Sequence, residues 1–438
     1  MPAKPALRIW LAFVLVLATL MAGFLVGPRS PANEQRQHCV ANLVTSSPFG
    51  LSLGCDAFHN LHIGREPQRL LDEGSFRQSR PLLAIPAYLL RPLFAWTQNA
   101  PVRLGIRPAP DISADYAPFV PDTLAKDFPT WLAYVLVNVL ELAAAFALYL
   151  RLTMGSAAGR GWDAASSAVV AVGAIGFLLI ANDVVKAFIF NAHVQMFNIL
   201  APLLGVLVLA KPAGSARRAA LVGFGAGIGI LAYPLMAVVA CCYGLRLLYD
   251  LFRERDLRAF VVRGALAAIC TAIPVLGWYW FVLWYVGSFY SDAVQYRQLI
   301  WIVDSFKAGT LIADLAGFFG ALLWQAMLQS AALVAMFALT LWLGSRRLLG
   351  SLGRTDRELV AAALVTCLVV WVFHALAGFS MARVAYGLLP PLVVVCGLLA
   401  RVAFQSAPAA QGRRAAVGFC ILIALQIVYT MVKAGPYG

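Results

Sequence analysis

Long apolar segments recur along the whole chain, with short polar connections between most of them. Each segment approaches the ~20 residues that an α-helix needs to cross hydrocarbon, and none alternates as membrane β-strands do. Because only helices and closed barrels satisfy their backbone in lipid, the pattern predicts an all-α, polytopic transmembrane bundle. We expect about eleven spans, at residues 9–26, 131–150, 164–182, 194–210, 219–233, 235–249, 260–286, 316–343, 359–377, 386–403 and 415–432.

Two of these boundaries depend on single features. The first apolar segment follows Lys4 and Arg8, as a signal peptide would, but it is longer than the roughly 7–15 residues of a signal-peptide core. We therefore expect a retained helix. The long apolar run 219–249 contains Tyr233-Pro234, and proline ends or kinks a helix, so we predict two helices joined by a tight turn.

Two connections are much longer than the others. Residues 27–130 form the largest polar piece, and residues 287–315 form the second. The apolar stretch 82–96 is interrupted by two prolines and an arginine, so we expect it to lie as a helix in the membrane interface rather than to span. The prediction is a single domain over residues 1–438, with interfacial helices in the first long loop.

Composition and charge agree with a membrane protein. Hydrophobic residues make up 61% of the 438 residues and charged ones 12%, against about 45–50% and about 25% in soluble domains. With the N-terminus in the cytoplasm, nineteen Lys and Arg residues fall on inner connections and helix ends and five on short outer ones. This skew predicts a cytoplasmic N-terminus and a periplasmic C-terminus in a bacterial inner membrane. The net charge of +14 then lies against anionic lipid, and no nucleic-acid partner is expected.

Cysteine, histidine and nucleotide-binding patterns add little. Six of eight cysteines fall inside the predicted spans, whereas Cys39 and Cys55 lie in the first outer loop. A disulfide between them and two free thiols are both compatible with that position. His59 and His62 are three residues apart with no third ligand nearby, so no metal site is predicted. The inner loops lack a G-x-x-x-x-G-K-[ST] sequence, and no cofactor is expected.

Three short motifs carry a resemblance to a known family. The first is Gly54-Cys55-Asp56, which is followed by a Gly at position 74 and by Arg80-Pro81-Leu82. The second is the Gly-rich run 223–234, which ends in Tyr-Pro, and the third is Arg383-Val-Ala-Tyr386 with a following proline. Their order resembles the GT-C superfamily of membrane glycosyltransferases, which includes protein O-mannosyltransferases and the aminoarabinose transferases of lipid A.

The sequence also departs from the pattern of that family. His59 and Asn60 stand where relatives often have a tyrosine, and arginine precedes Pro81 where a second proline is common. No second acidic residue adjoins Asp56, so a metal-binding D-x-D motif is absent. The chain has no large soluble C-terminal segment.

The resemblance implies transfer of a sugar from a polyprenyl-phosphate donor to an acceptor hydroxyl at the periplasmic membrane surface. The acceptor would be a glycan, a lipid or a protein. Asp56 matches the first-loop aspartate and is the candidate base, although an aspartate here also suits a helix cap. Arg80 and Arg383 are candidates for the donor phosphate, or else anchors to lipid headgroups.

Further candidates come from polar residues near the same membrane surface. Lys186 and His193 lie in a short outer loop and could bind phosphate or acceptor, although Lys186 could instead pair with the aspartate three residues before it. His59, Tyr386 and Glu141 are candidate acceptor contacts. Glu141 is mid-span, where a carboxyl group faces the protein interior or a cavity, and the alternative for it is a purely structural role. We expect His374, near an outer helix end, to be a buried and hydrogen-bonded histidine.

Two other classes of membrane protein remain compatible with the sequence. One is a transporter or flippase of lipid-linked sugars, which would need polar residues along a path through the bundle. The other is a polysaccharide polymerase or ligase of another fold. Polar residues gather at one surface and intramembrane charge is sparse, which favours surface chemistry over transport. The large loop follows the first span, whereas polymerases and ligases tend to carry their large outer loop late in the chain.

Overall fold

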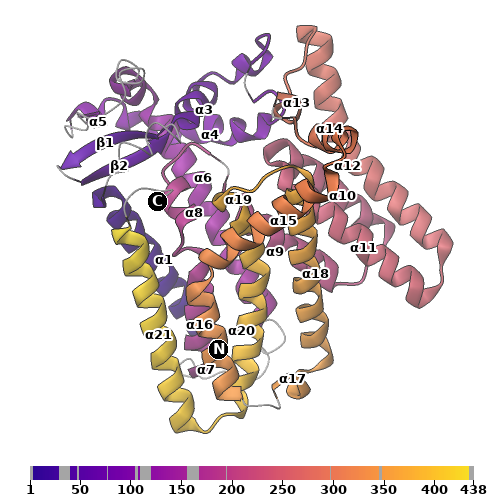
Figure 1. Ribbon diagram of the computed structural model, residues 1–438. Helices are drawn as coiled ribbons and strands as arrows, with labels where there is room; N and C mark the ends of the chain where they lie inside the picture. Colours follow the sequence, from indigo (N-terminus) through magenta and orange to yellow (C-terminus); the bar gives the residue numbers. More distant parts are fainter. Residues whose placement is uncertain are drawn as a thin grey trace.

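The computed structural model describes residues 3–28, 40–46, 49–75, 77–103, 107–108, 120–154, 167–193, 195–295, 297–344 and 348–433. The described chain is almost entirely helical, with one small sheet. Long helices form an elongated bundle, and the first loop lies over one end of it (Figure 1). Below we call this end the loop end.

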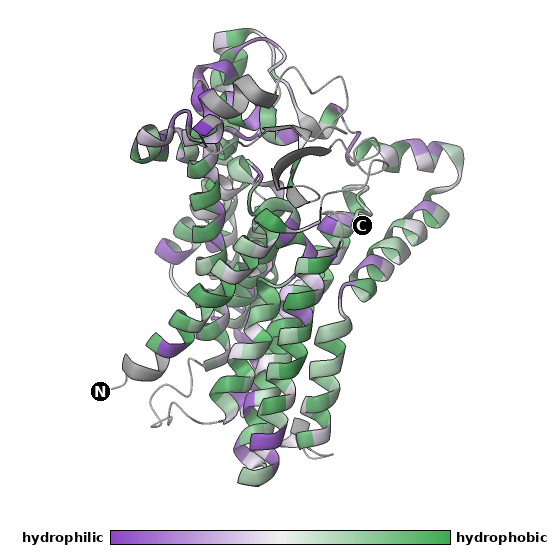
Figure 2. Cartoon of the chain, turned by 90° about the vertical axis from the view of Figure 1, so that its left-hand side faces the viewer, coloured by the Kyte–Doolittle hydropathy of each residue, from purple (hydrophilic) through white to green (hydrophobic). Residues whose placement is uncertain are grey.

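Helices cover all of the predicted apolar segments. They are α1 (Ala3–Val26), α6 (Val120–Met154), α7 (Ser167–Gly176), α9 (Phe197–Ala210), α10 (Ala216–Ala232), α11 (Ala237–Glu254), α12 (Leu257–Val286), α15 (Leu311–Leu328), α16 (Ala331–Gly344), α18 (Arg354–Leu376), α20 (Leu389–Ser406) and α21 (Ala409–Val432). Eight candidate spans in the described residues are long and apolar enough to cross a membrane, and three shorter apolar helices accompany them. Hydrophobic residues dominate along the bundle (Figure 2), as expected of a multi-pass membrane protein.

The predicted span 316–343 is divided into α15 and α16. The break falls at Gln329 and Ser330, where the side-chain amide of Gln329 donates to the backbone oxygens of Gln325 and Ala382 at 3.1 and 2.8 Å. Neither proline nor glycine marks this position. A polar contact with a segment distant in the sequence therefore accompanies the break, which explains why the local pattern predicted one continuous helix.

Short elements connect the long helices at both ends of the bundle. They are η4 (Phe177–Leu179), α8 (Asp183–Phe188), η5 (Pro234–Met236), α13 (Asp292–Gln295), α14 (Ile300–Ala308), α17 (Leu348–Ser351), α19 (Ala382–Ala385) and η6 (Tyr386–Leu388). The turn predicted at Tyr233-Pro234 is present. Tyr233 caps the end of α10 in an extended conformation, and Pro234 begins η5.

The first loop contains strands that the sequence analysis did not predict. β1 (Val40–Ser46) pairs antiparallel with β2 (Phe49–Gly54) and with the short β3 (Arg107–Pro108), in the order β2-β1-β3. The remaining elements of the loop are α3 (Cys55–Arg65), η1 (Pro67–Leu71), η2 (Pro81–Leu83), α4 (Ile85–Leu90), η3 (Arg91–Thr97) and α5 (Ala100–Arg103). The β1–β2 pairing is a local hairpin that the sequence analysis overlooked. The pairing of β1 with β3 joins Leu43 and Val44 to Pro108 and Arg107, which no local pattern shows.

The stretch 82–96 does not form one long helix. It is split among η2, α4 and η3, with prolines in the first turns of these elements. Leu89, Leu93 and Trp96 are 67%, 62% and 82% exposed. A chain of short helices with exposed apolar side chains suits the membrane interface, in agreement with the predicted absence of a span here.

A buried arginine ties three helices together away from the loop end. Arg401 on α20 is 3% exposed. Its Nη2 lies 2.6 Å from Oδ1 of Asp356 on α18, and its Nη1 donates to the backbone oxygen of Thr153 on α6 at 2.6 Å. The two views agree that α1 begins at the end opposite the loop end and that α21 ends beside it (Figures 1 and 2).

Candidate functional site

A cavity of about 1240 Å³ opens at the loop end of the bundle. It exceeds the ~300–1,000 Å³ of a typical small-molecule site. Its walls come from the first loop, α8, the Tyr233-Pro234 turn, the α15–α16 break, α18, α19 and α21. The lining residues with ionisable or amide side chains are Asp56, Arg77, Arg80, Asn182, Asp183, Asn191, His193, Gln195, Tyr233, Gln298, Gln325, Gln329, His374, Arg383, Gln426, Tyr429 and Lys433.

Asp56 is held at this cavity by the way α3 docks on the bundle. The backbone N–H of Gly54, the N-cap of α3, donates to Oδ1 of Asn191 at 2.8 Å. One turn into the helix, Nδ2 of Asn60 donates to the backbone oxygen of Ala192 at 2.6 Å. These two bonds fix α3 against the segment that follows α8. Asp56 lies in the first turn of α3, where a carboxylate is favoured by the helix dipole.

Arg77 is the closest partner of Asp56, and the sequence analysis did not select it. Its Nη2 lies 2.7 Å from Oδ2 of Asp56; the arginine side chain is 5% exposed and the aspartate side chain 47%. Arg77 has a φ of +76°, a left-handed conformation that costs a non-glycine residue about 1–3 kcal/mol and is frequent at functional sites. The sequence carries no signal of this backbone conformation, which is why Arg77 was missed.

Arg80, Arg383 and His193 border the same cavity. Nε2 of His193 lies 3.8 Å from Oδ2 of Asp56, a distance at which the two groups interact electrostatically rather than through a hydrogen bond. The Arg383 guanidinium lies 5.9 Å from the ring centroid of Phe188, in the range of a cation–π contact. Arg77, Arg80 and Arg383 all line this cavity together with Tyr233, so the three arginines converge on one cavity.

The protonation states of Asp56 and His193 follow from this arrangement. Burial raises the pKa of Asp56, but the interactions with His193 and the positive charges of Arg77 and Arg383 outweigh burial and hold that pKa well below its usual range. Burial lowers the pKa of His193 to about 4, with Arg77 and Arg383 acting in the same direction and Asp56 opposing them. At neutral pH the site therefore holds an ionised Asp56 beside a neutral imidazole.

The cavity as a whole favours an anion. Its lining contains four permanent cations, Arg77, Arg80, Arg383 and Lys433, and two carboxylates, Asp56 and Asp183. Two positive charges are left in excess within the described lining. Because charges in a partly dehydrated cleft interact more strongly than in water, such a lining suits a phosphate or another compact anion.

The other residues predicted from sequence do not line the cavity. Nζ of Lys186 donates to the backbone oxygen of Lys433. The carboxylate of Asp183, which the sequence offered as an alternative partner of Lys186, lies 2.8 Å from Nζ of Lys433. His59 is exposed on α3. Glu141 lies on α6, whose neighbouring Asn138 donates to the backbone oxygens of Phe188 and Asn191. The site thus assembles Asp56, Arg80, Arg383 and His193 and leaves out Lys186, His59, Glu141 and Tyr386.

Tyr386 and His374 differ from their predicted settings. The Tyr386 hydroxyl is buried and donates to the backbone oxygen of Leu178 at 2.8 Å, so it joins η6 to η4 instead of facing the cavity. His374 was expected to be hydrogen-bonded, but neither of its ring nitrogens has a hydrogen-bond partner within the described part of the chain. The predicted burial of His374 is confirmed, whereas the predicted hydrogen bond is not found among the described residues.

The described residues include the candidate metal ligands of the first loop but not both of its cysteines. Among the described residues, no group of three or more His, Cys, Asp or Glu side chains could hold a metal ion. Cys39 and the side chain of Cys55 lie outside the described residues. No protein-family model, curated protein or solved structure matches the chain.

Proposed function

We propose that this protein is a membrane glycosyltransferase of the GT-C kind, which moves a sugar from a polyprenyl-phosphate donor to an acceptor hydroxyl on the periplasmic side of a bacterial inner membrane. The observation that carries the proposal is the convergence of Arg77, Arg80 and Arg383 on one cavity that also contains the carboxylate of Asp56. A fixed cation cluster and a carboxylate are the two groups that this reaction requires.

The cationic residues suit the leaving group. A polyprenyl-phosphate sugar is a phosphodiester with one negative charge, and the released polyprenyl phosphate carries almost two near neutral pH. Guanidinium groups already in place stabilise the added charge without reorganising during the reaction. Arg77 and Arg80 are buried, which reduces the solvent screening of their charges.

In the proposed step the acceptor oxygen attacks the anomeric carbon of the donor sugar. The new oxygen–carbon bond forms as the bond between that carbon and the phosphate oxygen breaks, and the bonding electron pair leaves with the phosphate. The hydroxyl proton passes to Asp56. Attack from the face opposite the phosphate inverts the configuration at the anomeric carbon.

Arg77 links the two halves of this step. While it is paired with Asp56, the low pKa of that carboxylate makes it a weak base. The growing charge on the phosphate competes for the same guanidinium group. As Arg77 shifts toward the phosphate, the proton affinity of Asp56 rises, so the base gains strength when the leaving group departs.

The apolar rim of the cavity suits the isoprenoid tail. Leu328 at the end of α15 and Met381 before α19 both line the cavity, yet they are 58% and 51% exposed. Exposed apolar side chains at the rim of a cavity in a membrane helix bundle would face lipid. The tail can then remain in the membrane while the phosphate reaches the arginines.

A transfer assay tests the proposal. The purified protein in lipid nanodiscs would be incubated with polyprenyl phosphates carrying different radiolabelled sugars and with hydroxyl acceptors. We expect free polyprenyl phosphate and labelled acceptor to appear together. A parallel assay in sealed proteoliposomes would follow movement of the intact donors between leaflets. If the donors stay intact and only move between leaflets, the protein is a flippase and the transferase proposal is wrong.

Tyr386 provides a further test, because the sequence alone made it a candidate acceptor contact. Replacing Tyr386 with Phe removes the hydrogen bond to Leu178 and should destabilise the protein by about 0.5–1.5 kcal/mol, the net contribution of one hydrogen bond, because the Leu178 oxygen still accepts from Nδ2 of Asn182 at 3.1 Å. We expect the midpoint temperature of thermal unfolding to fall and the turnover per folded molecule to stay unchanged. If turnover is lost while the unfolding temperature stays the same, Tyr386 contacts the acceptor and its role is not only structural.

A further inference from the structure

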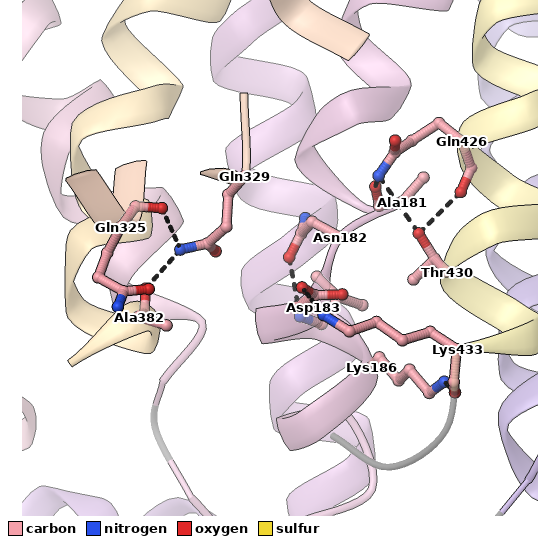
Figure 3. A network of polar contacts seen from close by, with 11 residues as sticks. Ala181, Asn182, Asp183, Lys186, Gln325, Gln329, Ala382, Gln426, Thr430 and Lys433 are labelled. Atoms are coloured by element: carbon pink, nitrogen blue, oxygen red, sulfur yellow. Dashed lines mark hydrogen bonds and ion pairs between the residues drawn. The ribbon is translucent and has the colours of Figure 1, made fainter. Parts of the chain in front are cut away.

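The cavity lining contains a second group of polar side chains besides those around Asp56, and we call this group the second end of the cavity. Asp183 on α8 and Lys433 after α21 form one wall, together with Gln426 on α21. Gln325 and Gln329, at the α15–α16 break, form another. Figure 3 shows these two groups on opposite sides of the view, with the amides of Gln325 and Gln329 on one side and the Asp183–Lys433 pair on the other.

Among the described residues that line the cavity, the two charges at this second end cancel. Nζ of Lys433 lies 2.8 Å from Oδ2 of Asp183, and the two side chains are 20% and 25% exposed. The Lys433 backbone oxygen also accepts a bond from Lys186, which holds the end of α21 against α8. Such a half-buried ion pair offers no net charge to a ligand, in contrast to the excess of positive charge at the cationic end.

The remaining groups at this end are neutral hydrogen-bonding side chains. The NH₂ group of Gln329 is occupied by the backbone oxygens of Gln325 and Ala382, and that of Gln426 by the backbone oxygen of Ala181 at 3.0 Å. Each amide is thereby oriented, with its carbonyl oxygen as an acceptor for a hydroxyl group. Tyr429 on α21 also lines the cavity and is 52% exposed, and it offers an aromatic face.

His374 gives an independent indication of a ligand. It lines the cavity and is 2% exposed, yet neither ring nitrogen has a hydrogen-bond partner within the described residues. Buried polar groups in native proteins are nearly always hydrogen-bonded, and an orphan calls for a specific explanation. Rotation of the ring toward the cavity would let a bound hydroxyl supply the missing partner.

We infer that the second end of the cavity binds the sugar of the donor, and that this sugar is uncharged. The inference rests on the proposed function, which puts the donor phosphate at the cationic end. An acidic sugar would require an unpaired cation here and an amino sugar an unpaired carboxylate, because a charge placed in a partly dehydrated site without a partner is strongly disfavoured. Neutral hydroxyl groups match the amides and the imidazole.

A donor series with one polyprenyl chain tests the inference. The probes are polyprenyl phosphates that carry a neutral hexose, a uronic acid or an amino sugar, and polyprenyl phosphate without sugar. We expect kcat/KM for the neutral donor to exceed that for each charged donor about tenfold or more. Equal kcat/KM values for the neutral and charged donors would overturn the inference and leave the proposed function intact.

Two single substitutions should change the preference among the sugar donors in opposite directions. Asp183→Asn leaves Lys433 unpaired and should raise the relative kcat/KM of the uronic acid donor. Lys433→Met leaves Asp183 unpaired and should raise that of the amino sugar donor. Asp304→Asn, which alters an exposed aspartate paired with Arg297 outside the cavity, is the matched control and should keep the wild-type preference.

Binding of the sugar-free lipid separates this inference from the proposed function. Native mass spectrometry should detect polyprenyl phosphate on the wild type, on Asp183→Asn and on Lys433→Met alike, because the arginines are unchanged. His374→Phe keeps an aromatic ring and removes both nitrogens, so it should lower kcat/KM for the neutral donor and retain the sugar-free lipid. Identical donor preferences in all variants would overturn the inference, and failure of the wild type to bind any of these lipids would overturn both proposals.

Discussion

Replacing Asp56 with Asn is expected to reduce sugar transfer by roughly 10²–10⁴-fold, the usual contribution of a positioned base. The amide keeps the size of the side chain and cannot accept the acceptor proton. Because the Asp56 side chain is 47% exposed, the substitution should leave the fold intact. The measurement is single-turnover release of polyprenyl phosphate by purified wild type and variant at matched donor occupancy.

The controls for Asp56→Asn address charge and folding. Asp304→Asn also removes one carboxylate from an arginine partner, but at an exposed position outside the cavity, and should turn over donor like the wild type. Removal of the Asp56 charge takes away a carboxylate that competes with the phosphate for Arg77, so donor binding by Asp56→Asn should be equal or tighter. Undiminished turnover by this variant would exclude Asp56 as the base.

Replacing Arg77 with Met should have the second largest effect, with two separable consequences. Loss of one donor to the leaving phosphate is expected to lower kcat about 10²–10³-fold. The second consequence concerns pH. Arg77 helps to hold the pKa of Asp56 below its usual range against the effect of burial, which raises it. Without Arg77 the pKa of Asp56 rises, so the carboxylate takes up a proton at a higher pH.

The sign of this pH effect is testable. In the wild type Asp56 stays ionised at neutral pH, and His193, with a pKa of about 4, stays neutral. Neither group should produce an acidic limb in kcat/KM between about pH 5 and 8. In Arg77→Met the acidic limb should move upward in pH, because the base is lost as Asp56 is protonated. Arg297→Met removes an exposed arginine and should leave the profile unchanged, and an unshifted limb in Arg77→Met would refute the coupling between the two residues.

Part of the candidate site was predictable, because some of its residues lie in local motifs. Asp56, Arg80 and Arg383 were selected from short motifs that resemble those of a known family, and His193 from its place in a short outer loop, and the structure brings all four to one cavity. A motif and a loop position are local properties, so the sequence reports them. Their membership in one cavity required that the first loop, the segment after α8 and α19 converge.

The rest of the site depends on contacts between segments far apart in the sequence. Asp183 and Lys433 are separated by 250 residues, and the sequence around either residue does not predict that they form an ion pair. Gln329 bonds to Ala382 and lies at the break between α15 and α16, although the hydropathy pattern there is continuous. His374 resembles any histidine near a helix end until its surroundings show that both ring nitrogens lack a described partner.

The sequence by itself determined the helical, multi-pass architecture, because the free energy of transferring a residue to lipid is a local quantity that adds up along each apolar segment. It also determined which polar residues gather near helix ends. Only the tertiary structure decided which of them share a cavity, that Arg77 adopts a left-handed backbone conformation to reach Asp56, and that Lys433 neutralises Asp183. These features arise from the packing of distant segments, which no local window of the chain contains.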